Sequence, residues 1–338
     1  MVSVEPLPLS PTWSEDILGA DFQRMTFEMD VDPDGCPPAI VTLVRYVPQA
    51  DNEKFSTRPA IFYIPGTSDY FFHRHVAEFF HERGYAFYAV DLRKCGRSWQ
   101  PGQRWHYVTD LGIYFKDLCR ATEQVLDDGH SDIFLLGHST GGLLVPIWLD
   151  HLRASGDTTM LPFIRGAVLN SPWLDFFFPT LTMMVIRRLV PYMAMQHPEA
   201  KIYSRKLVAY VKSLHKDFDG EWDFSLDYKP VGGHDKYWGW ANAIMRSIER
   251  VRSGSVKCPV PLLVLCSMHS QLDKPLDERT HVTDVVLDVD EIIKRSVSLG
   301  DEVTTIPIDN ARHDVFLSRR PAREQALKTC EQWLTQQL

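Results

Sequence analysis

The sequence predicts an α/β protein with a mostly parallel sheet that helices cover on both faces, and with a helical cap inserted near one end of that sheet. Three observations lead to this prediction. Short apolar runs alternate with segments of helical periodicity along most of the 338 residues. One apolar run ends in a Gly-x-Ser-x-Gly turn that leads directly into a helical pattern. Between residues 172 and 253 the alternation gives way to a mostly helical, aromatic segment.

The expected elements follow one another in a simple order. An extended arm at residues 6–11 comes first. Two strands at 22–29 and 39–47 follow, separated by the Asp-Pro-Asp-Gly turn at 32–35. The later strands are short and mostly apolar, as in a parallel sheet buried on both faces: 60–64, 85–90, 133–136, 167–169, 262–265 and 302–308. Helices are expected at 72–83, 109–126, 143–152, 288–299 and 320–338.

The aromatic segment divides the chain. Residues 1–171 and 254–338 are expected to form the two parts of one α/β core, and residues 172–253 a helical cap after the sixth strand. An insertion at this point covers the carboxyl edge of the sheet. Individually, the cap aromatics are expected to be core residues more often than substrate contacts. An apolar pocket wall made by some of them is still expected, and its candidates are Trp173, Phe177 and Trp238.

Composition argues against several classes of function. The net charge is −8 and the Lys and Arg residues are scattered, whereas a nucleic-acid partner needs a basic face. No Gly-x-Gly-x-x-Gly follows a strand, so no dinucleotide cofactor is predicted. His73 and His75 are two positions apart on an expected helix, where they do not share a face, so no metal is predicted either.

The cysteines and the start of the chain bear on location. Cys36 and five other cysteines are widely spaced without a Cys-x-x-Cys pair, and residues 1–6 lack the features of a secretory signal. Free thiols and a cytoplasmic location are the expectation. Residues 176–195 are rich in apolar side chains, but prolines and arginines interrupt them, so no membrane insertion is predicted.

The most informative stretch is residues 132–142, Asp-Ile-Phe-Leu-Leu-Gly-His-Ser-Thr-Gly-Gly. An apolar strand, a Gly-x-Ser-x-Gly turn and a helix in this order are the pattern of a nucleophile elbow. Gly137 and Gly141 fit, because a side chain at either position would crowd the strained turn. Ser139 is the candidate nucleophile. The backbone amide of Thr140, at the start of the helix, is a candidate oxyanion donor.

Such a serine needs a base to take its proton and an acid to orient the base. With this kind of elbow the partners follow along the chain in the order Ser, acid, His. His313 lies in the loop after the last predicted strand and is the candidate base. The second oxyanion donor is expected after the strand 60–64, where Pro65-Gly66-Thr67 offers the Thr67 amide.

Three aspartates are candidates for the acid. Asp288, with Glu291 three residues on, fits a helix-capping pair better. Asp273 lies nearest the strand 262–265 but in a polar stretch. Asp284 precedes Val-Val-Leu at 285–287, which offers an anchor on the core, so Asp284 is favoured and Asp273 stays the alternative.

With these residues in view, the chain resembles the lysophospholipase and monoacylglycerol-lipase-like branch of the α/β-hydrolases, which carries a serine aminopeptidase (S33) type domain. The resemblance implies the α/β-hydrolase fold and an acid at Asp284. In two places the chain departs from the usual pattern: Pro65-Gly66 stands in place of His-Gly, and Lys94-Cys95 in place of Gly-His. Besides the elbow, the matching segments are 64–66, 69–72, 91–98, 170–173, 284–289 and 313–318.

These observations predict a serine hydrolase that cleaves small carboxylic esters with a hydrophobic acyl or alkyl group. By resemblance, a lysophospholipid or monoacylglycerol is the expected type of substrate. An aminopeptidase or acyltransferase with the same triad is an alternative, and a non-catalytic ligand-binding protein is another. An aminopeptidase needs carboxylates to bind a free amine, and the cap has an acidic stretch that otherwise fits a solvated face: Asp217, Asp219, Glu221, Asp223 and Asp227.

Overall fold

The fold is that of the computed structural model, which describes residues 5–35, 38–48, 55–203 and 207–338. Its main feature is a nine-stranded sheet with the order β1-β2-β3-β5-β4-β6-β7-β10-β11. The pairs from β1 to β5 are antiparallel, and every pair from β5 to β11 is parallel. The strands are β1 Ser14–Asp16, β2 Gly19–Glu28, β3 Ile40–Tyr46, β4 Ala60–Ile64, β5 Ala86–Asp91, β6 Ile133–His138, β7 Ile164–Asn170, β10 Leu262–Ser267 and β11 Val303–Ile308.

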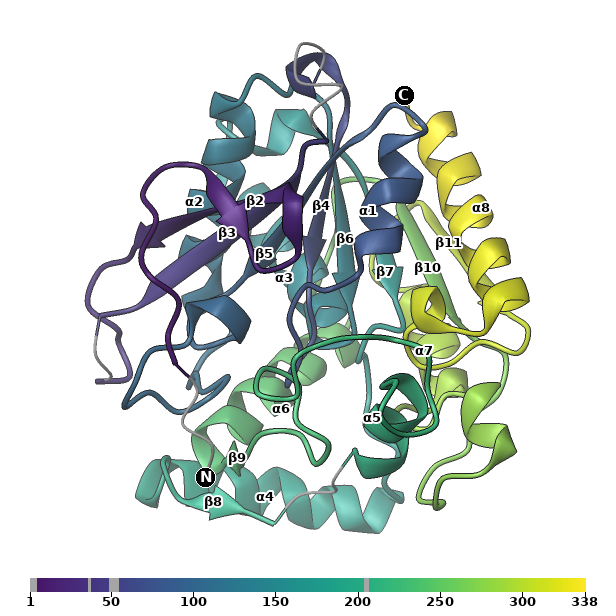
Figure 1. The fold of residues 1–338 in the computed structure, drawn as a ribbon. Coiled ribbons are helices and arrows are strands. Elements are labelled where there is room, and N and C mark those ends of the chain that lie inside the picture. Colours follow the sequence, from purple (N-terminus) through teal and green to yellow (C-terminus); the bar gives the residue numbers. More distant parts are fainter. Residues whose placement is uncertain (1–4, 36–37, 49–54, 204–206) are drawn as a thin grey trace.

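Helices cover both faces of this sheet (Figure 1). α1 and α8 pack on one face, and α2, α3 and α7 pack on the other. The mostly parallel, doubly covered sheet that the sequence predicts is therefore confirmed. The core helices are α1 Arg74–His81, α2 Ile113–Asp127, α3 Thr140–Ser155, α7 Val289–Ser296 and α8 Arg320–Gln336, with short 3-10 turns at Phe55–Thr57, Gly96–Ser98, Leu161–Phe163, Glu278–His281 and Val315–Leu317.

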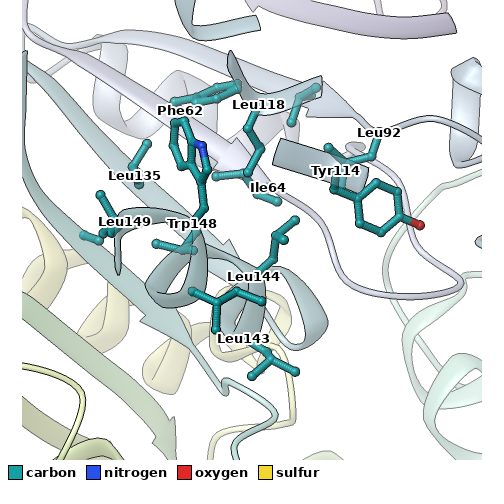
Figure 2. Close-up of a cluster of buried hydrophobic side chains, with 14 of the residues drawn as sticks. Phe62, Ile64, Leu92, Tyr114, Leu118, Leu135, Leu143, Leu144, Trp148 and Leu149 are labelled. Carbon is teal, nitrogen blue, oxygen red and sulfur yellow. The ribbon is translucent and has the colours of Figure 1, made fainter. Parts of the chain in front are cut away.

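The central strands are mostly apolar because both of their faces are buried. Along β4, Phe62 and Ile64 point into one core cluster, and Ile61 and Tyr63 point into the other. Figure 2 shows the first cluster, where Trp148 of α3 packs with Phe62 and Ile64. Burying an apolar side chain of this size stabilises the fold by about 1.5–3 kcal/mol. The strand that leads to Ser139 and the helix that follows it are thus held on a rigid core.

The cap connects β7 to β10 and lies at one end of the sheet (Figure 1). The sequence placed it after the sixth strand, but it follows the seventh, because the three-residue strand β1 is too short to show alternation. The long stretch between α5 and α6 is mostly irregular, so the cap is less helical than expected. Its elements are α4 Thr180–Gln196, α5 Val208–Leu214, α6 Trp238–Arg252 and an antiparallel ribbon of β8 Lys201–Ile202 with β9 Lys236–Tyr237.

The described residues also include most of the cysteines. The described cysteines Cys95, Cys119, Cys258, Cys266 and Cys330 are free thiols, whereas Cys36 and residues 1–4 lie outside the described residues. Within the described ranges, no helix is long and apolar enough to span a bilayer. No group of three potential metal ligands occurs in that part of the chain either.

One expectation about helix geometry is wrong. α1 begins at Arg74 rather than at residue 72, so His73 precedes the helix. His73 and His75 consequently both reach the segment after His313. His73 Nε2 lies 2.8 Å from Asp314 Oδ2, and His75 Nε2 donates to the Phe316 carbonyl oxygen at 2.9 Å.

Candidate active site

Ser139 occupies a strained turn between β6 and α3. Its φ of 54° and ψ of −111° lie outside the regions that side-chain-bearing residues favour. The two flanking glycines make the turn possible. A Cβ on Gly137 would lie 2.6 Å from the Gly141 carbonyl oxygen, and a Cβ on Gly141 would overlap the Ile64 carbonyl oxygen. The strand–turn–helix geometry expected of a nucleophile elbow is therefore present.

His313 meets Ser139 from the loop that follows β11. Its Nε2 lies 3.0 Å from Ser139 Oγ, and its Nδ1 lies 2.8 Å from Asp284 Oδ2. The three residues are 174 and 29 positions apart along the chain, so only the fold brings them together. Ser139 is 8% exposed and the other two are nearly inaccessible, which shields both hydrogen bonds from competing water.

Asp284 is fixed by its own loop. Its Oδ1 accepts the backbone amides of Val286 at 2.7 Å and Leu287 at 2.8 Å, which leaves Oδ2 for His313. The buried side chains of Val285 and Leu287 anchor the loop on the core, as the sequence suggested. Asp284 is fully buried.

The two other candidate acids lie elsewhere. Asp288 is the N-cap of α7, where its side chain accepts the Asp290 amide at 3.1 Å, as the capping interpretation expected. Asp273 is exposed on a turn with a φ of 57°. Of the three aspartates, the structure brings Asp284 alone to His313.

The loop after β4 lies against the serine. A Cβ on Gly66 would be 3.0 Å from Ser139 Cβ, so Thr67 follows directly at the edge of the nucleophile. Across the described chain, neither the Thr67 amide nor the Thr140 amide donates a hydrogen bond to another protein group. Two free amides beside a serine are the arrangement that an oxyanion hole needs.

Ser139 and His313 open onto a cavity of about 420 Å³ between the core and the cap. The three predicted substrate contacts, Trp173, Phe177 and Trp238, all line it. Most of the remaining wall is apolar, with contributions from α4 and α6. The acidic stretch of the cap, by contrast, contributes no residue to the described lining.

A buried polar network surrounds the residue that follows His313. Asp314, next to His313, accepts from Asn170 Nδ2 at 2.7 Å and from the Phe316 amide at 3.0 Å, and it contacts His73. Burial alone would raise the pKa of Asp314, but the neighbouring His138 and His73 and its hydrogen bonds hold that pKa well below its usual range. The network fixes the histidine loop to the end of β7.

A second buried carboxylate extends this network to the cap. Asp69 Oδ1 lies 2.7 Å from Lys229 Nζ, and Asp69 Oδ2 lies 3.3 Å from His138 Nδ1. Burial opposes the ionised form of Asp69, but Lys229 and His138 lower its pKa to about 2. Asp69 is therefore ionised at neutral pH, and its ion pair joins the loop after β4 to the cap.

Comparison with known proteins identifies the family. The family model described as "Serine aminopeptidase, S33" matches residues 56–318, a range that contains Ser139, Asp284 and His313. The chain belongs to the S33 serine aminopeptidase family. None of the curated proteins compared with it matches.

Several solved structures have a similar fold. A monoacylglycerol lipase of Paleococcus ferrophilus has a TM-score of 0.59 at 18% identity, covering 83% of this chain and 96% of its own. A soluble variant of the Saccharomyces cerevisiae monoglyceride lipase, in complex with a substrate analog, has a TM-score of 0.57 at 16% identity, covering 99% and 97%. A thermostable carboxyl esterase of Bacillus coagulans, in complex with glycerol, has a TM-score of 0.64 at 14% identity, covering 94% and 99%. At these identities the likeness shows the α/β-hydrolase fold.

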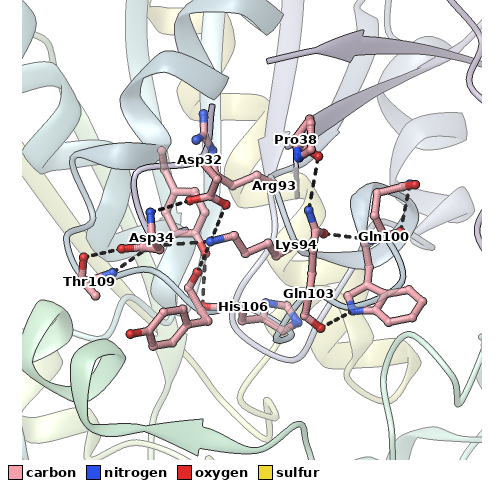
Figure 3. A network of polar contacts seen from close by, with 12 residues as sticks. Asp32, Asp34, Pro38, Arg93, Lys94, Gln100, Gln103, His106 and Thr109 are labelled. Atoms are coloured by element: carbon pink, nitrogen blue, oxygen red, sulfur yellow. Dashed lines mark hydrogen bonds and ion pairs between the residues drawn. The ribbon is translucent and has the colours of Figure 1, made fainter. Parts of the chain in front are cut away.

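One departure of this S33-family chain from the usual pattern has a structural explanation. Lys94 has a φ of 62°, a conformation that favours glycine, and its side chain is completely buried. Its Nζ lies 2.6 Å from Asp32 Oδ2 and 3.5 Å from Asp34 Oδ2, and it donates to the Tyr107 carbonyl oxygen at 2.8 Å (Figure 3). Removing one partner of such a pair typically costs about 3–5 kcal/mol, because the other charge is then left buried and unpaired, so Lys94 and its aspartates depend on one another.

Sequence reasoning missed the charged residues that join the cap to the site. Lys229 and Lys236 lie in the irregular part of the cap and at its small ribbon, where no periodicity marks them. Asp69 was visible only as part of a family-like motif. The sequence did contain one signal for Asp314, which lies between the candidate base and an apolar run. If that loop is buried, a charged residue there must have a partner, so a buried ion pair or hydrogen bond could have been predicted.

Proposed function

We propose that this protein is a serine ester hydrolase that works through an acyl-enzyme. The observation that supports this most strongly is the continuous hydrogen-bonded series from Ser139 through His313 to Asp284 at the floor of the cavity, with distances of 3.0 and 2.8 Å. Such a series activates a hydroxyl group that is otherwise a weak nucleophile. Membership of a family named for a serine hydrolase supports the same conclusion.

In the proposed reaction, Ser139 Oγ attacks the ester carbonyl carbon while His313 Nε2 takes the hydroxyl proton. The oxyanion of the tetrahedral intermediate accepts hydrogen bonds from the backbone amides of Thr67 and Thr140. Asp284 keeps His313 in the required orientation and stabilises its charged form. The C–O bond then breaks, and His313 returns the proton to the leaving alcohol. Water activated by His313 releases the acid in a second step of the same form and restores Ser139.

The cavity favours a substrate with a hydrophobic acyl or alkyl chain. Trp173, Phe177 and Trp238 are proposed to contact it, together with apolar residues of α4 and α6. Esterases and monoacylglycerol lipases among the structures with this fold agree with such a substrate.

The aminopeptidase alternative has less support. Three members of the acidic stretch, Asp219, Glu221 and Asp223, pair with His281, Arg323 and Lys216 on the surface, and none of them lines the cavity. Asp69 does line the cavity, but its carboxylate forms an ion pair with Lys229. A free amine therefore finds no carboxylate left for it among the described cavity residues, whereas an ester needs none.

A fluorophosphonate probe tests the proposal. We expect covalent labelling at Ser139, identified by mass spectrometry of the modified peptide, and turnover of a neutral 4-nitrophenyl ester. Ser139→Ala and His313→Ala should abolish both. The exposed residues Ser131 and His269 supply the matched controls Ser131→Ala and His269→Ala, which should keep both. Folded wild-type protein that neither labels nor hydrolyses the ester would contradict the proposal and favour a ligand-binding role.

A further inference from the structure

One cationic side chain of the cavity has a role that the triad does not explain. Lys236, at the start of β9, lines the same cavity as Ser139 and His313. Its Nζ donates to Thr67 Oγ1 at 3.1 Å and to Ser68 Oγ at 2.9 Å. The ammonium group therefore lies on the loop whose Thr67 amide is the proposed oxyanion donor.

Lys236 differs from the buried lysines of the described chain in having no counter-ion. Lys94 and Lys229 each have a carboxylate oxygen within 2.7 Å. For Lys236 no carboxylate of the described residues lies within the 4.0 Å of an ion pair. The neighbouring Asp235 is exposed and pairs with Lys201 instead. An ammonium group has three donors, and the two hydroxyl contacts leave one of them without an oxygen acceptor. Lys236 Nζ also lies 4.8 Å from the centre of the Trp240 ring, a contact that does not neutralise its charge.

The other titratable groups around Lys236 do not neutralise it. Burial lowers the pKa of His234 to about 4 and that of His106 well below its usual value, so both are neutral at pH 7. Burial raises the pKa of the Cys95 thiol, which is therefore neutral too. Burial also lowers the pKa of Lys236, to about 8, which leaves the group mostly charged at pH 7.

The cavity as a whole has the opposite sign to the molecule. Its described lining includes two lysines, Lys229 and Lys236, and a single carboxylate, Asp69, so its formal charge is +1. The whole chain carries −8. A positive charge inside an otherwise apolar cleft attracts anions strongly, because the low-dielectric walls focus its field. The missing counter-ion is therefore best supplied by a ligand.

We propose that Lys236 binds an anionic group of the substrate, a carboxylate or a phosphate, so that the preferred ester is an anionic amphiphile rather than a neutral ester. This inference rests on the proposed ester hydrolysis. The anion accepts the third donor of Lys236 beside Thr67, while the hydrophobic part of the substrate contacts apolar residues of α4 and α6 such as Ile186, Val190, Ile244 and Met245. A lysine suits this role as a compact point charge.

The test compares matched anionic and neutral esters. The acyl-side pairs are 4-nitrophenyl monoesters of succinate, glutarate and adipate against butyrate, pentanoate and hexanoate. The alcohol-side pair is the butyryl ester of glycerol phosphate against that of glycerol. For wild-type protein we expect kcat/KM at least tenfold higher for the anionic member in one of the two arms, through KM. The arm that shows this increase identifies whether the anion lies on the acyl or the alcohol side of the ester. It also identifies whether the site accepts a carboxylate or a phosphate.

Variants of Lys236 separate binding from positioning. Lys236→Met should bring the anionic-to-neutral ratio close to one, and Lys236→Arg should restore most of it. Lys201→Met removes the same charge from the adjacent strand of the ribbon and should leave the ratio unchanged. If Lys236→Met lowers kcat equally for both members, the lysine only holds the Thr67–Ser68 turn and the proposal is wrong. A wild-type ratio near one in both arms would also overturn it.

Two further measurements keep the result independent of the variants and of catalysis. In wild-type protein the ratio of kcat/KM for the anionic ester to that for the neutral ester should fall as the pH rises through about 8, because Lys236 loses its charge there. In Ser139→Ala protein, which cannot turn over, monomethyl glutarate should bind more tightly than methyl pentanoate in a calorimetric titration. If Ser139 is not labelled but the anionic ligand still binds more tightly, the proposed hydrolase function is wrong and the proposed anion site remains supported.

Discussion

Asp284 shows how a carboxylate acquires its role from backbone contacts. Two amides of its own loop bind Oδ1, so the side chain cannot rotate and Oδ2 stays on His313 Nδ1. Asp273 is closer to the end of β10 along the chain, but it lies on an exposed turn. The two aspartates therefore differ in how firmly their loops are held. Only Asp284 is followed by an apolar Val-Val-Leu segment that anchors its loop on the core.

Asp284→Asn should lower kcat by about 10⁴. The amide oxygen can still accept hydrogen bonds from the two loop amides, but the side chain no longer holds neutral His313 in the right tautomer or stabilises its charged form. Neutral-ester kinetics measure this, with urea unfolding to show that the variant folds. Asp273→Asn is the control and should keep wild-type kinetics. Equal kinetics for both variants would mean that another group orients His313.

At the scale of single residues, the sequence predicted those positions that a motif or chain order marks. The Gly-x-Ser-x-Gly motif marks Ser139, and the position after the last strand marks His313. The structure places Ser139 Oγ and His313 Nε2 3.0 Å apart. Lys236 and Thr67 are 169 residues apart, and neither belongs to a periodic pattern. Their contact depends on how the irregular part of the cap folds over the core, which local propensity does not encode.

Among the elements, the turn between β6 and α3 tolerates the least change. Gly141 approaches the carbonyl groups of Ile64 and Pro65 so closely that no side chain fits. Gly156 ends the same helix with a φ of 69° and has open space around it. The two glycines thus serve different needs at the two ends of α3, namely close packing at Gly141 and a left-handed conformation at Gly156.

Gly141→Ala should abolish fluorophosphonate labelling of Ser139, because the added methyl group pushes the elbow away from β4 and its loop. Gly156→Ala should keep labelling and lower the free energy of unfolding by about 1 kcal/mol, the cost of a left-handed alanine. Labelling rates and urea unfolding of the two variants provide the measurement. Normal labelling of folded Gly141→Ala would show that the elbow is more adaptable than its packing indicates.

The sequence predicted elements well where periodicity and flanking signals agreed. The strands β4, β6 and β11 and the helices α2 and α8 lie within a few residues of their expected ranges. The two-residue strands β8 and β9 and the three-residue β1 were missed, because such short segments show no alternation. α1 starts late because His73 is drawn to Asp314, a tertiary contact that outweighs helix propensity.

In the whole molecule, the Asp69–Lys229 pair joins the two parts of the fold. Asp69 belongs to the loop after β4 and Lys229 to the cap, and both are nearly inaccessible. The folded state holds the pKa of Asp69 at about 2, below its ordinary value of 3.8. A group of this kind stabilises the fold above its unfolded pKa and loses that contribution as the pH falls toward its folded pKa.

The free energy of unfolding should therefore contain about 2 kcal/mol from Asp69 at pH 7, and this part should disappear between about pH 4 and pH 2. Urea unfolding of wild type and Asp69→Asn along this range provides the measurement, and the gap between them should narrow as the pH falls. The double variant Asp69→Asn/Lys229→Met should regain part of the stability that each single variant loses. Parallel curves for wild type and Asp69→Asn would show that the pair adds no acid-sensitive stability.

The two lysines that reach from the cap to the oxyanion loop also limit how this protein can be recombined. Lys229 contacts Asp69, and Lys236 contacts Thr67 and Ser68, so three consecutive core residues depend on one short cap segment. A chimera that takes its cap from another hydrolase must keep residues 229–236 with the recipient core or replace both ammonium groups. In terms of function, residues 229–236 thus belong with the core, although they lie within the cap.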